Sequence, residues 1–318
     1  MAEVRGGRGG HHLRGRLEQQ RATAMGSGRL QRVPRLLRIA TRASPLALWQ
    51  ADRVATLLGE ACEVVAVESL GDRVQDRPLH ELGGQGVFVK EVQAAVMCGA
   101  ADLAVHSAKD LPSAPAPDGL VLACVPERAD VRDCLVGLRL DQLASGATVA
   151  TGSVRRRAQL KALRPDLVLV ELRGNMATRM AKVPPGGSVV AAAAALQRLG
   201  WTDRIAQLLE PDVLLPQVAQ GALAVECRAD DAEVLERLAR IEDPIARRCV
   251  DAERAFLARL GGGCDLPVGG LATDLGAGRL RLEGLLADPT PHRLVAEGVD
   301  PSALGLAVAE AILASASP

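Results

Sequence analysis

Short apolar runs alternate with segments of helical spacing along most of the chain. The first helical segment begins at Pro45, with Ser44 as its N-cap, and is expected to end near Gly59. A second helix is expected from about Phe88. The apolar runs that flank these helices predict strands over 36–41, 63–69 and 102–106. This βαβ alternation indicates an α/β domain with a parallel or mixed sheet.

The same alternation returns after 126–133, a stretch rich in proline, aspartate and arginine. A strand over 147–150, a helix over 153–163 and a strand over 167–171 predict a second α/β domain. The tail has a different order, because one long helix precedes three apolar stretches and a closing helix from Pro301. The long helix is expected over 244–260 and the apolar stretches are 267–273, 279–286 and 293–299. This order indicates a small α+β domain.

Cysteine usage and hydropathy limit the classes of protein to consider. The seven cysteines are scattered and form no CxxC pair, so neither a disulfide framework nor a structural zinc site is indicated. We expect no metal and a reducing, cytoplasmic location. The longest uncharged apolar run, 189–196, is too short to cross a bilayer, so no membrane association is expected.

Charge is unevenly distributed although the whole chain is formally neutral. Residues 1–35 hold eight arginines against Glu3 and Glu18, a surplus of six positive charges, which leaves six net negative charges on the remainder. Such a body is poorly suited to sequence-independent nucleic-acid binding, and we expect no nucleic-acid partner. The Gly/Arg-rich segment 1–35 is expected to be a disordered leader.

Three predicted strand–helix junctions combine polar side chains with arginine. They are 41–44 with Arg42 and Ser44, 151–156 with Thr151, Ser153, Arg155 and Arg156, and 172–179 with Arg173 and Arg179. The free amides and the dipole of a helix start attract anions, and arginine forks bind carboxylates bidentately. Together the junctions indicate a ligand with several carboxylates. Each one alone also fits a capped helix with a solvated basic face.

Two further stretches carry candidate chemistry. The strand over 102–106 leads to Lys109 and Asp110 at its carboxyl end, the edge at which open α/β sheets bind ligands. Such a pair is often only solvent-facing. Cys264 follows three glycines, which permit positive φ and close approach of the backbone. Alone, this cysteine also fits an incidental thiol after the end of a helix.

Six strings of the sequence resemble the porphobilinogen deaminase family in order and in spacing. They are 38–50 (RIATRASPLALWQ), 83–91 (GGQGVFVKE), 104–112 (AVHSAKDLP), 172–175 (LRGN), 220–228 (QGALAVECR) and 261–264 (GGGC). The match extends over roughly 36–318. The resemblance implies two periplasmic-binding-protein-like α/β domains, with the site in the cleft between them, plus a small C-terminal α+β domain that presents the cysteine.

The resemblance and the element pattern together predict the domain organisation. We expect a leader over 1–35, a first α/β domain over 36–127 to which the chain returns at about 218–240, a second over 128–217, and a C-terminal domain over 241–318. We also expect a monomer.

Site residues follow from the same resemblance. Cys264 matches the cofactor cysteine, whose sulfur holds a dipyrromethane primer by a thioether, and Asp110 matches the catalytic carboxylate. Phe88 matches an aromatic side chain near the pyrroles. The positions that bind the acetate and propionate side chains of cofactor and substrate are matched by Lys109, Arg42, Ser44, Thr151, Ser153, Arg155, Arg156, Arg173, Arg179 and Arg198.

The implied activity is hydroxymethylbilane synthesis, a step of tetrapyrrole and heme biosynthesis. Pyrrole nitrogen electrons expel ammonia from porphobilinogen and leave a positively charged azafulvene, which a fixed carboxylate near the pyrrole N–H groups can stabilise. The same carboxylate can pass protons to the departing amine and from the carbon where rings join. Four rounds and attack by water release the product, while the primer stays attached.

The sequence departs from the family pattern at several positions. Gly152 stands where serine is usual, and the segment between Arg179 and Arg198 is about two residues short. Ala195 and Ala219 stand where glycine is common. We expect these departures to affect affinity and rate more than reaction type.

Other functions fit parts of the pattern. A solute-binding or ligand-sensing protein of the same two-domain fold would account for an arginine-lined cleft, but not for Asp110 or for a cysteine on a third domain. A nucleic-acid binder built on 155–157 conflicts with the acidic body and the scarcity of aromatic residues. A pseudoenzyme remains open because of the departures.

Overall fold

The computed structural model describes residues 35–68, 86, 89–262, 266–288 and 290–316. Residues 1–35 and 36–318 form separate units, and every helix and strand described below belongs to the second. The expected leader over 1–34 therefore lies outside the described residues. No helix in the described part of the chain is long and apolar enough to cross a membrane.

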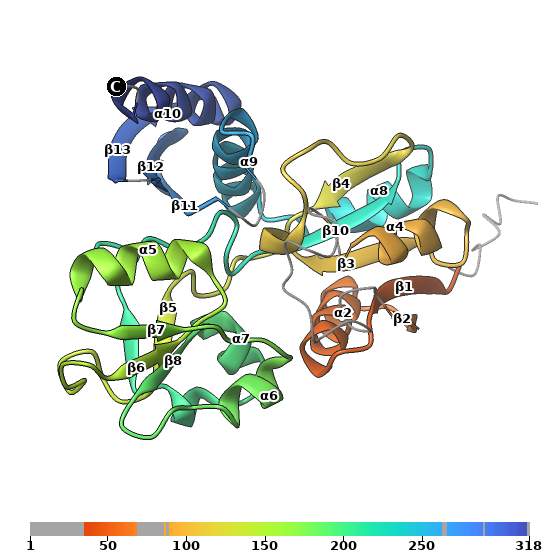
Figure 1. Ribbon diagram of the computed structural model, residues 1–318. Coiled ribbons are helices and arrows are strands. Elements are labelled where there is room, and N and C mark those ends of the chain that lie inside the picture. The colour runs from red at the N-terminus through yellow and green to blue at the C-terminus, as the bar shows by residue number, and fades with distance from the viewer. Residues whose placement is uncertain (1–34, 69–85, 87–88, 263–265, 289, 317–318) are drawn as a thin grey trace, which may run out of the picture. The chain divides into compact units, whose positions relative to one another are not determined.

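The first sheet has five strands in the order β2-β1-β3-β10-β4 (Figure 1). β1 pairs in parallel with β2 and β3, whereas β10 is antiparallel to β3 and β4. Among the described residues, three helices and one 3-10 turn, η2, accompany this sheet. The bounds are β1 Leu37–Arg42, α2 Pro45–Leu58, β2 Cys62–Val67, α4 Lys90–Met97, β3 Leu103–Ser107, η2 Ala108–Asp110, β4 Leu120–Cys124, β10 Leu223–Arg228 and α8 Ala232–Ala239.

The second sheet repeats this mixed arrangement in the order β7-β6-β8-β5-β9. β6 pairs in parallel with β7 and β8, and β5 is antiparallel to β8 and β9. The bounds are β5 Asp133–Gly137, β6 Thr148–Ala150, α5 Val154–Leu163, β7 Val168–Val170, α6 Met176–Met180, β8 Ser188–Ala192, α7 Ala193–Arg198, η3 Thr202–Arg204 and β9 Gln207–Leu209. Two chain segments, 125–132 and 210–222, connect the two sheets.

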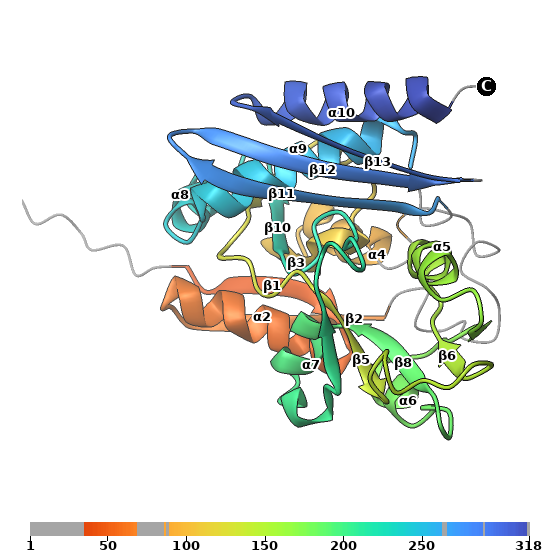
Figure 2. The ribbon, with the colours of Figure 1, turned by 90° about the vertical axis from the view of Figure 1, so that its left-hand side faces the viewer.

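The C-terminal part is an antiparallel sheet, β11-β12-β13, against which α9 and α10 pack (Figure 2). The bounds are α9 Pro244–Arg259, β11 Val268–Gly276, β12 Arg279–Ala287, β13 Pro291–Gly298 and α10 Pro301–Ala316. Phe256 of α9 is fully buried, and the approach is close, because a Cβ added to Gly284 of β12 would lie 2.8 Å from its ring.

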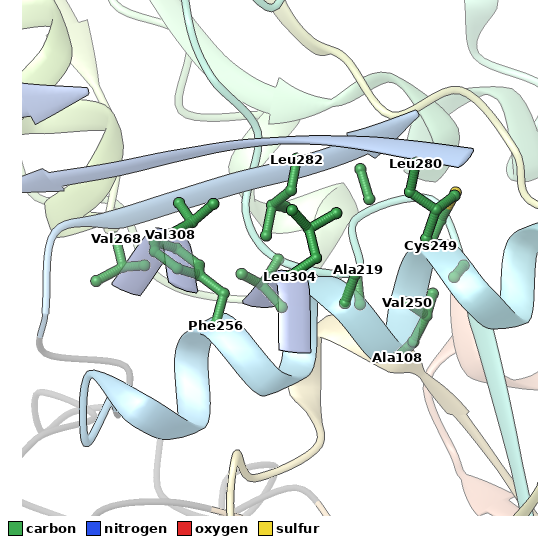
Figure 3. Packing of buried hydrophobic residues seen from close by; sticks show 14 of the residues in the cluster. Ala108, Ala219, Cys249, Val250, Phe256, Val268, Leu280, Leu282, Leu304 and Val308 are labelled. Atoms are coloured by element: carbon green, nitrogen blue, oxygen red, sulfur yellow. The ribbon is translucent and has the colours of Figure 1, made fainter. Parts of the chain in front are cut away.

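The largest apolar cluster joins this C-terminal part to the first sheet. It contains Ala224 of β10. Figure 3 shows other members of the cluster: Ala108, which follows β3, together with Phe256, Leu282 and Val308. Glu253 of α9 is also fully buried. Its carboxylate accepts hydrogen bonds from Arg128 at 2.6 and 3.0 Å and from the backbone amides of Ala219 at 2.6 Å and Ala272 at 2.8 Å.

The predicted fold class is confirmed: two mixed α/β sheets are followed by a C-terminal antiparallel sheet with helices. Where the sequence predicted bounds, they agree with the structure to within two residues, except that β11 ends three residues beyond the expected 273. Ser44 caps α2 as expected. Phe88 lies outside the described residues, and α4 begins at Lys90.

Candidate active site

A pocket lies at the carboxyl ends of β1 and β3 in the first sheet. Three of the predicted site residues, Arg42, Ser44 and Asp110, line it although they come from separate stretches of sequence. Parallel strands bring their carboxyl ends to one edge, which is why these residues meet. The remaining lining residues are Thr41, Leu46, Ala47, Gln50, Val89, Val105, His106 and Ser107.

Hydrogen bonds within the protein shape the wall of this pocket. Ser44 Oγ accepts from the amide of Ala47 at 3.3 Å and so begins α2 directly after β1. The buried Thr41 Oγ1 donates to the carbonyl of Val105 at 3.2 Å, which joins the ends of β1 and β3. Gln50 Nε2 donates to Ser107 Oγ at 2.8 Å. The wall is therefore fixed before any ligand binds.

Lys109 and Asp110 lie in η2, the turn that follows β3, and they differ in exposure. Asp110 is exposed, whereas Lys109 is half-buried and its Nζ lies 3.4 Å from Gln220 Oε1. Burial lowers the pKa of Lys109 to about 8. The positive charges of Arg156 and Arg155 act in the same direction, and the negative charges of Asp110 and Asp133 oppose them.

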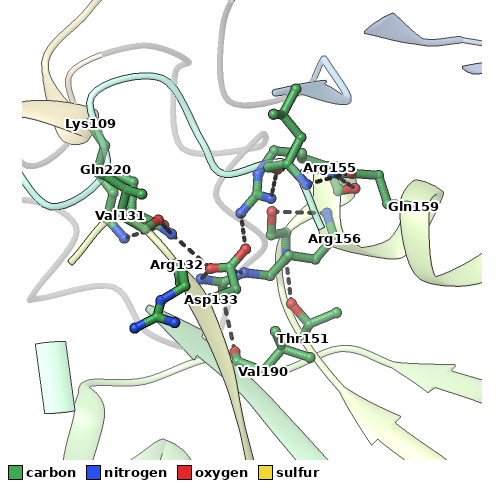
Figure 4. A network of polar contacts seen from close by, with 12 residues as sticks. Lys109, Val131, Arg132, Asp133, Thr151, Arg155, Arg156, Gln159, Val190 and Gln220 are labelled. Carbon is green, nitrogen blue, oxygen red and sulfur yellow. Dashed lines mark hydrogen bonds and ion pairs between the residues drawn. The ribbon is translucent and has the colours of Figure 1, made fainter. Parts of the chain in front are cut away.

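Asp133 at the start of β5 is the centre of a buried polar network (Figure 4). Its carboxylate accepts from Arg155 Nη2 at 2.7 Å, from Arg156 Nη2 and Nε at 2.6 and 3.1 Å, and from Gln220 Nε2 at 2.9 Å. Burial raises the pKa of Asp133, but the two guanidinium groups outweigh it and hold that pKa well below its usual range. Since Gln220 also reaches Lys109, one continuous network extends from η2 to α5.

The two arginines of this network are buried, with 3% exposure for Arg155 and 6% for Arg156. The alternative of a solvated basic face is therefore wrong for both. Arg155 Nη1 donates to the carbonyl of Leu215, but Arg155 Nε has no hydrogen-bond partner among the described residues. Within the network the three cations Lys109, Arg155 and Arg156 outnumber the carboxylates that act on them, Asp133 and, at Lys109, also Asp110. This excess of cationic groups can hold anionic ligand groups.

The junction before α5 also holds Thr151 and Ser153. Ser153 Oγ caps the helix by accepting from the amide of Arg156 at 3.4 Å, and the buried Thr151 Oγ1 accepts from the amide of Ser153 at 3.3 Å. A Cβ at Gly152 would lie 2.6 Å from the carbonyl oxygen of Leu172. In this structure a side chain at 152 therefore requires the backbone after β7 to move.

The third junction is at the start of α6. Asn175 Oδ1 caps this helix by accepting from the amide of Thr178 at 3.0 Å, and Arg179 Nε donates to the carbonyl of Gly174 at 2.8 Å. Burial lowers the pKa of Arg179, Arg156 lowers it further, and Asp110 raises it. The charges of the second and third junctions and of η2 thus act on one another. Arg173, which precedes Gly174 at this junction, is half-buried.

Arg198 closes α7 and connects to the first sheet. Its Nη2 donates to the carbonyl of Gly221 at 2.7 Å, and its guanidinium lies 5.6 Å from the ring centroid of Trp49 on α2. Burial lowers the pKa of Arg198 to about 10. Arg198 therefore contacts both the connecting segment 210–222, through Gly221, and the helix α2, through Trp49.

Two predicted residues, Cys264 and Phe88, lie outside the described residues. The chain just before Cys264 is described, and Ser113 Oγ donates to the carbonyl of Gly262 at 2.6 Å. Ser113 follows η2 by a few residues. The stretch leading to Cys264 is thus bonded to the stretch that follows Asp110.

Sequence reasoning missed Asp133, Gln220, His106 and Gln50. Asp133 ends the stretch 126–133, which the sequence indicated only as a boundary. The other three stand inside the matched strings, so their positions were available. Their partners come from strands and segments that are distant in sequence, which no local pattern indicates.

Comparison with known proteins identifies the family. A family model described as "Porphobilinogen deaminase, dipyromethane cofactor binding domain" matches residues 37–236, and one for the C-terminal domain of porphobilinogen deaminase matches 247–314. The chain belongs to the porphobilinogen deaminase family. Porphobilinogen deaminase of Roseiflexus sp. (strain RS-1) is 50% identical over 289 residues, 86% of this chain and 95% of that protein. That of Acidithiobacillus ferrooxidans (strain ATCC 53993 / BNL-5-31) is 46% identical over 295 residues, 89% of this chain and 96% of that protein.

Family membership makes the chain an enzyme of tetrapyrrole biosynthesis, a porphobilinogen deaminase (hydroxymethylbilane synthase) with a dipyrromethane cofactor domain. This decides against the solute-binding and pseudoenzyme alternatives. Among solved structures, the periplasmic VFT2 domain of BvgS from Bordetella pertussis is 21% identical, with a TM-score of 0.35 over 65% of this chain and 86% of that chain. No functional conclusion follows from that likeness.

The described residues of this porphobilinogen deaminase fit a dipyrromethane with carboxylate side chains. Arg155 keeps an unpartnered Nε although it is buried, and the surrounding network has more cationic groups than carboxylates. Lys109 and Arg179 add cationic groups whose pKa values burial has lowered, as expected of cations that lack a full set of counter-charges. A carboxylate ligand would supply the missing counter-charge.

Proposed function

We propose that the region 36–318 joins four porphobilinogen molecules head to tail on a dipyrromethane bonded through a thioether to Cys264, and releases hydroxymethylbilane and ammonia. One observation carries this proposal: the exposed carboxylate of Asp110 shares a pocket with Arg42 and Ser44 and adjoins, through Lys109, the buried arginine network. When bound, the dipyrromethane supplies the ring carbon to which the first substrate is joined.

In this proposal Asp110 stabilises positive charge. Ammonia leaves porphobilinogen with the electron pair of its C–N bond, and a positive charge develops on the pyrrole. A carboxylate that is exposed at the end of a rigid strand can face the pyrrole N–H without first breaking a contact. Fixed placement of this kind is the usual source of charge stabilisation in active sites.

The cationic residues bind and orient the acidic side chains. The carboxylate-binding set consists of Lys109, Arg42, Ser44, Thr151, Ser153, Arg155, Arg156, Arg173, Arg179 and Arg198. Their support is positional: most of them lie at strand ends and helix starts, where free amides add to the attraction for anions, whereas Arg179 and Arg198 lie at the ends of the short helices α6 and α7. Phe88 is proposed to lie near the pyrroles.

The domain boundaries, a cytoplasmic location and a monomeric state also belong to this proposal. Sheet membership supports boundaries near 127/128, 217/218 and 240/241, because β10 pairs with β3 and β4. The six described cysteines are unpaired thiols, which agrees with a reducing compartment.

The test of covalent attachment is the intact mass of the purified protein. If Cys264 holds a dipyrromethane, the protein is heavier than its sequence by two pyrrole units, and the excess survives denaturation because a thioether does. Limiting porphobilinogen adds a ladder of identical further steps. Cys264→Ser lacks both, whereas serine at Cys98, which is exposed and remote in sequence, keeps both. The bare sequence mass, in protein made by a host that supplies porphobilinogen, would overturn the proposal.

A further inference from the structure

Two of the sequence strings that match the family each contain a buried ionisable residue with no role so far. His106 stands in 104–112 and Glu226 in 220–228. β3 and β10 bring them together, because His106 is paired with Ala224 and Glu226 with Ala104 in the antiparallel register. Residues two apart on paired strands share a face of the sheet, and His106 Nε2 lies 3.1 Å from Glu226 Oε2.

The pair is enclosed, with 4% of the His106 side chain and 2% of the Glu226 side chain exposed. Gln93 of α4 donates from Nε2 to both carboxylate oxygens of Glu226 at 3.0 Å and fixes its orientation. From α9, the charge of Glu226 acts on Arg254, whose pKa burial lowers and Glu226 raises. The Nε2–Oε2 approach does not have hydrogen-bond geometry. The carboxylate of Glu226 is thus held next to the imidazole of His106. There it attracts the ring most strongly when the ring is protonated.

His106 also lines the pocket that holds Asp110, Arg42 and Ser44. Since Nε2 faces Glu226, Nδ1 is the nitrogen left for the pocket. Buried ionisable pairs add little to fold stability compared with apolar residues of the same size, so stability alone gives little reason for this one. An imidazole with a carboxylate behind it is a common proton acceptor, because the carboxylate stabilises the imidazolium that forms.

We propose that His106 is a second catalytic residue of this site, which accepts the proton released at each condensation, with Glu226 as its positioning residue. The inference rests on the proposed function above. Porphobilinogen binds with its aminomethyl group as ammonium; the C–N bond breaks and its electron pair leaves with ammonia. A C–C bond then forms and the ring carbon loses one proton. Neutral His106 takes that proton and passes it to ammonia, which departs as ammonium. Asp110 keeps the task of stabilising the cation.

The test is the pH dependence of a single condensation step, followed as growth of the mass ladder with limiting porphobilinogen. A base must be neutral to act, so the wild-type rate falls toward low pH as the imidazole becomes protonated. His106→Gln is expected to slow the step about 100-fold, the low end for loss of a general base, and to remove this acidic limb. Its dipyrromethane content, read from the resting mass, is expected to be unchanged.

Glu226→Gln is the second variant, and it keeps an acceptor for Gln93 but removes the charge. The imidazolium then loses the carboxylate that stabilises it, so the acidic limb should move to lower pH and the maximal rate should fall. Asp102→Asn is the matched control, because Asp102 is a fully buried carboxylate that precedes the same strand and binds Arg38 instead. It should lower the melting temperature without moving the limb.

A His106→Gln protein within threefold of the wild-type rate, with the acidic limb intact, would overturn the assignment. If that variant does not fold, an unmoved limb in Glu226→Gln overturns it instead. Failure of the proposed function itself gives a different result, because the wild-type protein would then show neither the resting mass excess nor a ladder.

Discussion

The first and second sheets carry their charged site residues in opposite ways. At the edge of the first sheet, Asp110 is exposed in a short turn, and the wall around it is held by hydrogen bonds of Thr41 and Gln50. In the second sheet, Arg155 and Arg156 are buried, and a carboxylate of the protein itself, Asp133, orients them. The first region presents a reactive group and the second prepares a binding surface.

This difference predicts two kinds of mutational effect, one on the reaction rate and one on the stability of the fold. An exposed carboxylate on a satisfied scaffold can be replaced with little effect on folding, so its loss should appear almost wholly in the reaction rate. A buried cation held by a buried anion cannot be changed without affecting the free energy of unfolding. Substitutions in the two regions should therefore give different combinations of lost activity and lost stability.

Asp133→Asn is expected to give the largest effect on stability. It leaves Arg155 and Arg156 buried without their counter-charge, at a cost of about 3–5 kcal/mol in the free energy of unfolding. Because the folded pKa of Asp133 lies below its unfolded value of about 3.9, its contribution is complete above that value and is lost as pH falls below about 4. Urea titrations at pH 7 and pH 3 measure this. The gap between wild type and variant should narrow at pH 3, and a constant gap contradicts the assigned network.

Asp110→Asn should show the opposite combination. The amide cannot offset the charge that develops on the pyrrole, so the condensation rate should fall on the order of 100-fold to 1,000-fold. The melting temperature should stay within about a degree of wild type, since the side chain is exposed. Bilane formation and calorimetry on the same preparation give both numbers. Near-wild-type turnover would remove Asp110 from its role.

Lys109 lies where the two regions meet, and its pKa of about 8 gives a pH test. Above pH 8 the ammonium becomes neutral and binds carboxylates less well, so KM for porphobilinogen should rise between pH 8 and pH 9 by a factor of about 5. Lys109→Arg keeps its charge there, and its KM should stay flat over that range. Parallel KM profiles in the two proteins would show that Lys109 does not bind substrate.

The smallest expected effects come from two alanines at positions where the family often has glycine. Ala219 precedes Gln220 and has a φ of 59°, in the left-handed region that disfavours a Cβ, so Ala219→Gly should stabilise the protein by about 0.5–1 kcal/mol. Ala195 is buried inside α7, where Ala195→Gly should destabilise by about 1 kcal/mol. Thermal unfolding should give shifts of opposite sign. Equal signs would show that the backbone at 219 is not strained.

The first region was the more predictable from sequence, and the reason is local. Ser44-Pro45 specifies a helix start, and β1 is a short apolar run. Because parallel strands have their carboxyl ends at one edge of a sheet, Arg42 and Asp110 lie together. The second region was not predictable in detail. α5 reads VRRRAQLKAL, which has no apolar stripe to indicate that two arginines face inward. Their burial depends on Asp133 from β5 and on Gln220 from the segment that returns to β10. Such partners are set by topology and register, which adjacent residues do not encode.

The position of Glu253 bears on how this enzyme unfolds. One fully buried carboxylate holds Arg128 and Ala219, which lie on the two segments connecting the sheets, and Ala272 of β11, while the largest apolar cluster crosses between the first sheet and α9. The C-terminal part is matched by its own family model, yet eight of the 22 buried residues in this cluster belong elsewhere in the chain. It should therefore lack a separate melting transition: calorimetry of the intact protein should give one cooperative peak that includes the C-terminal part and the first sheet, and an isolated fragment 241–318 should show no cooperative unfolding of its own.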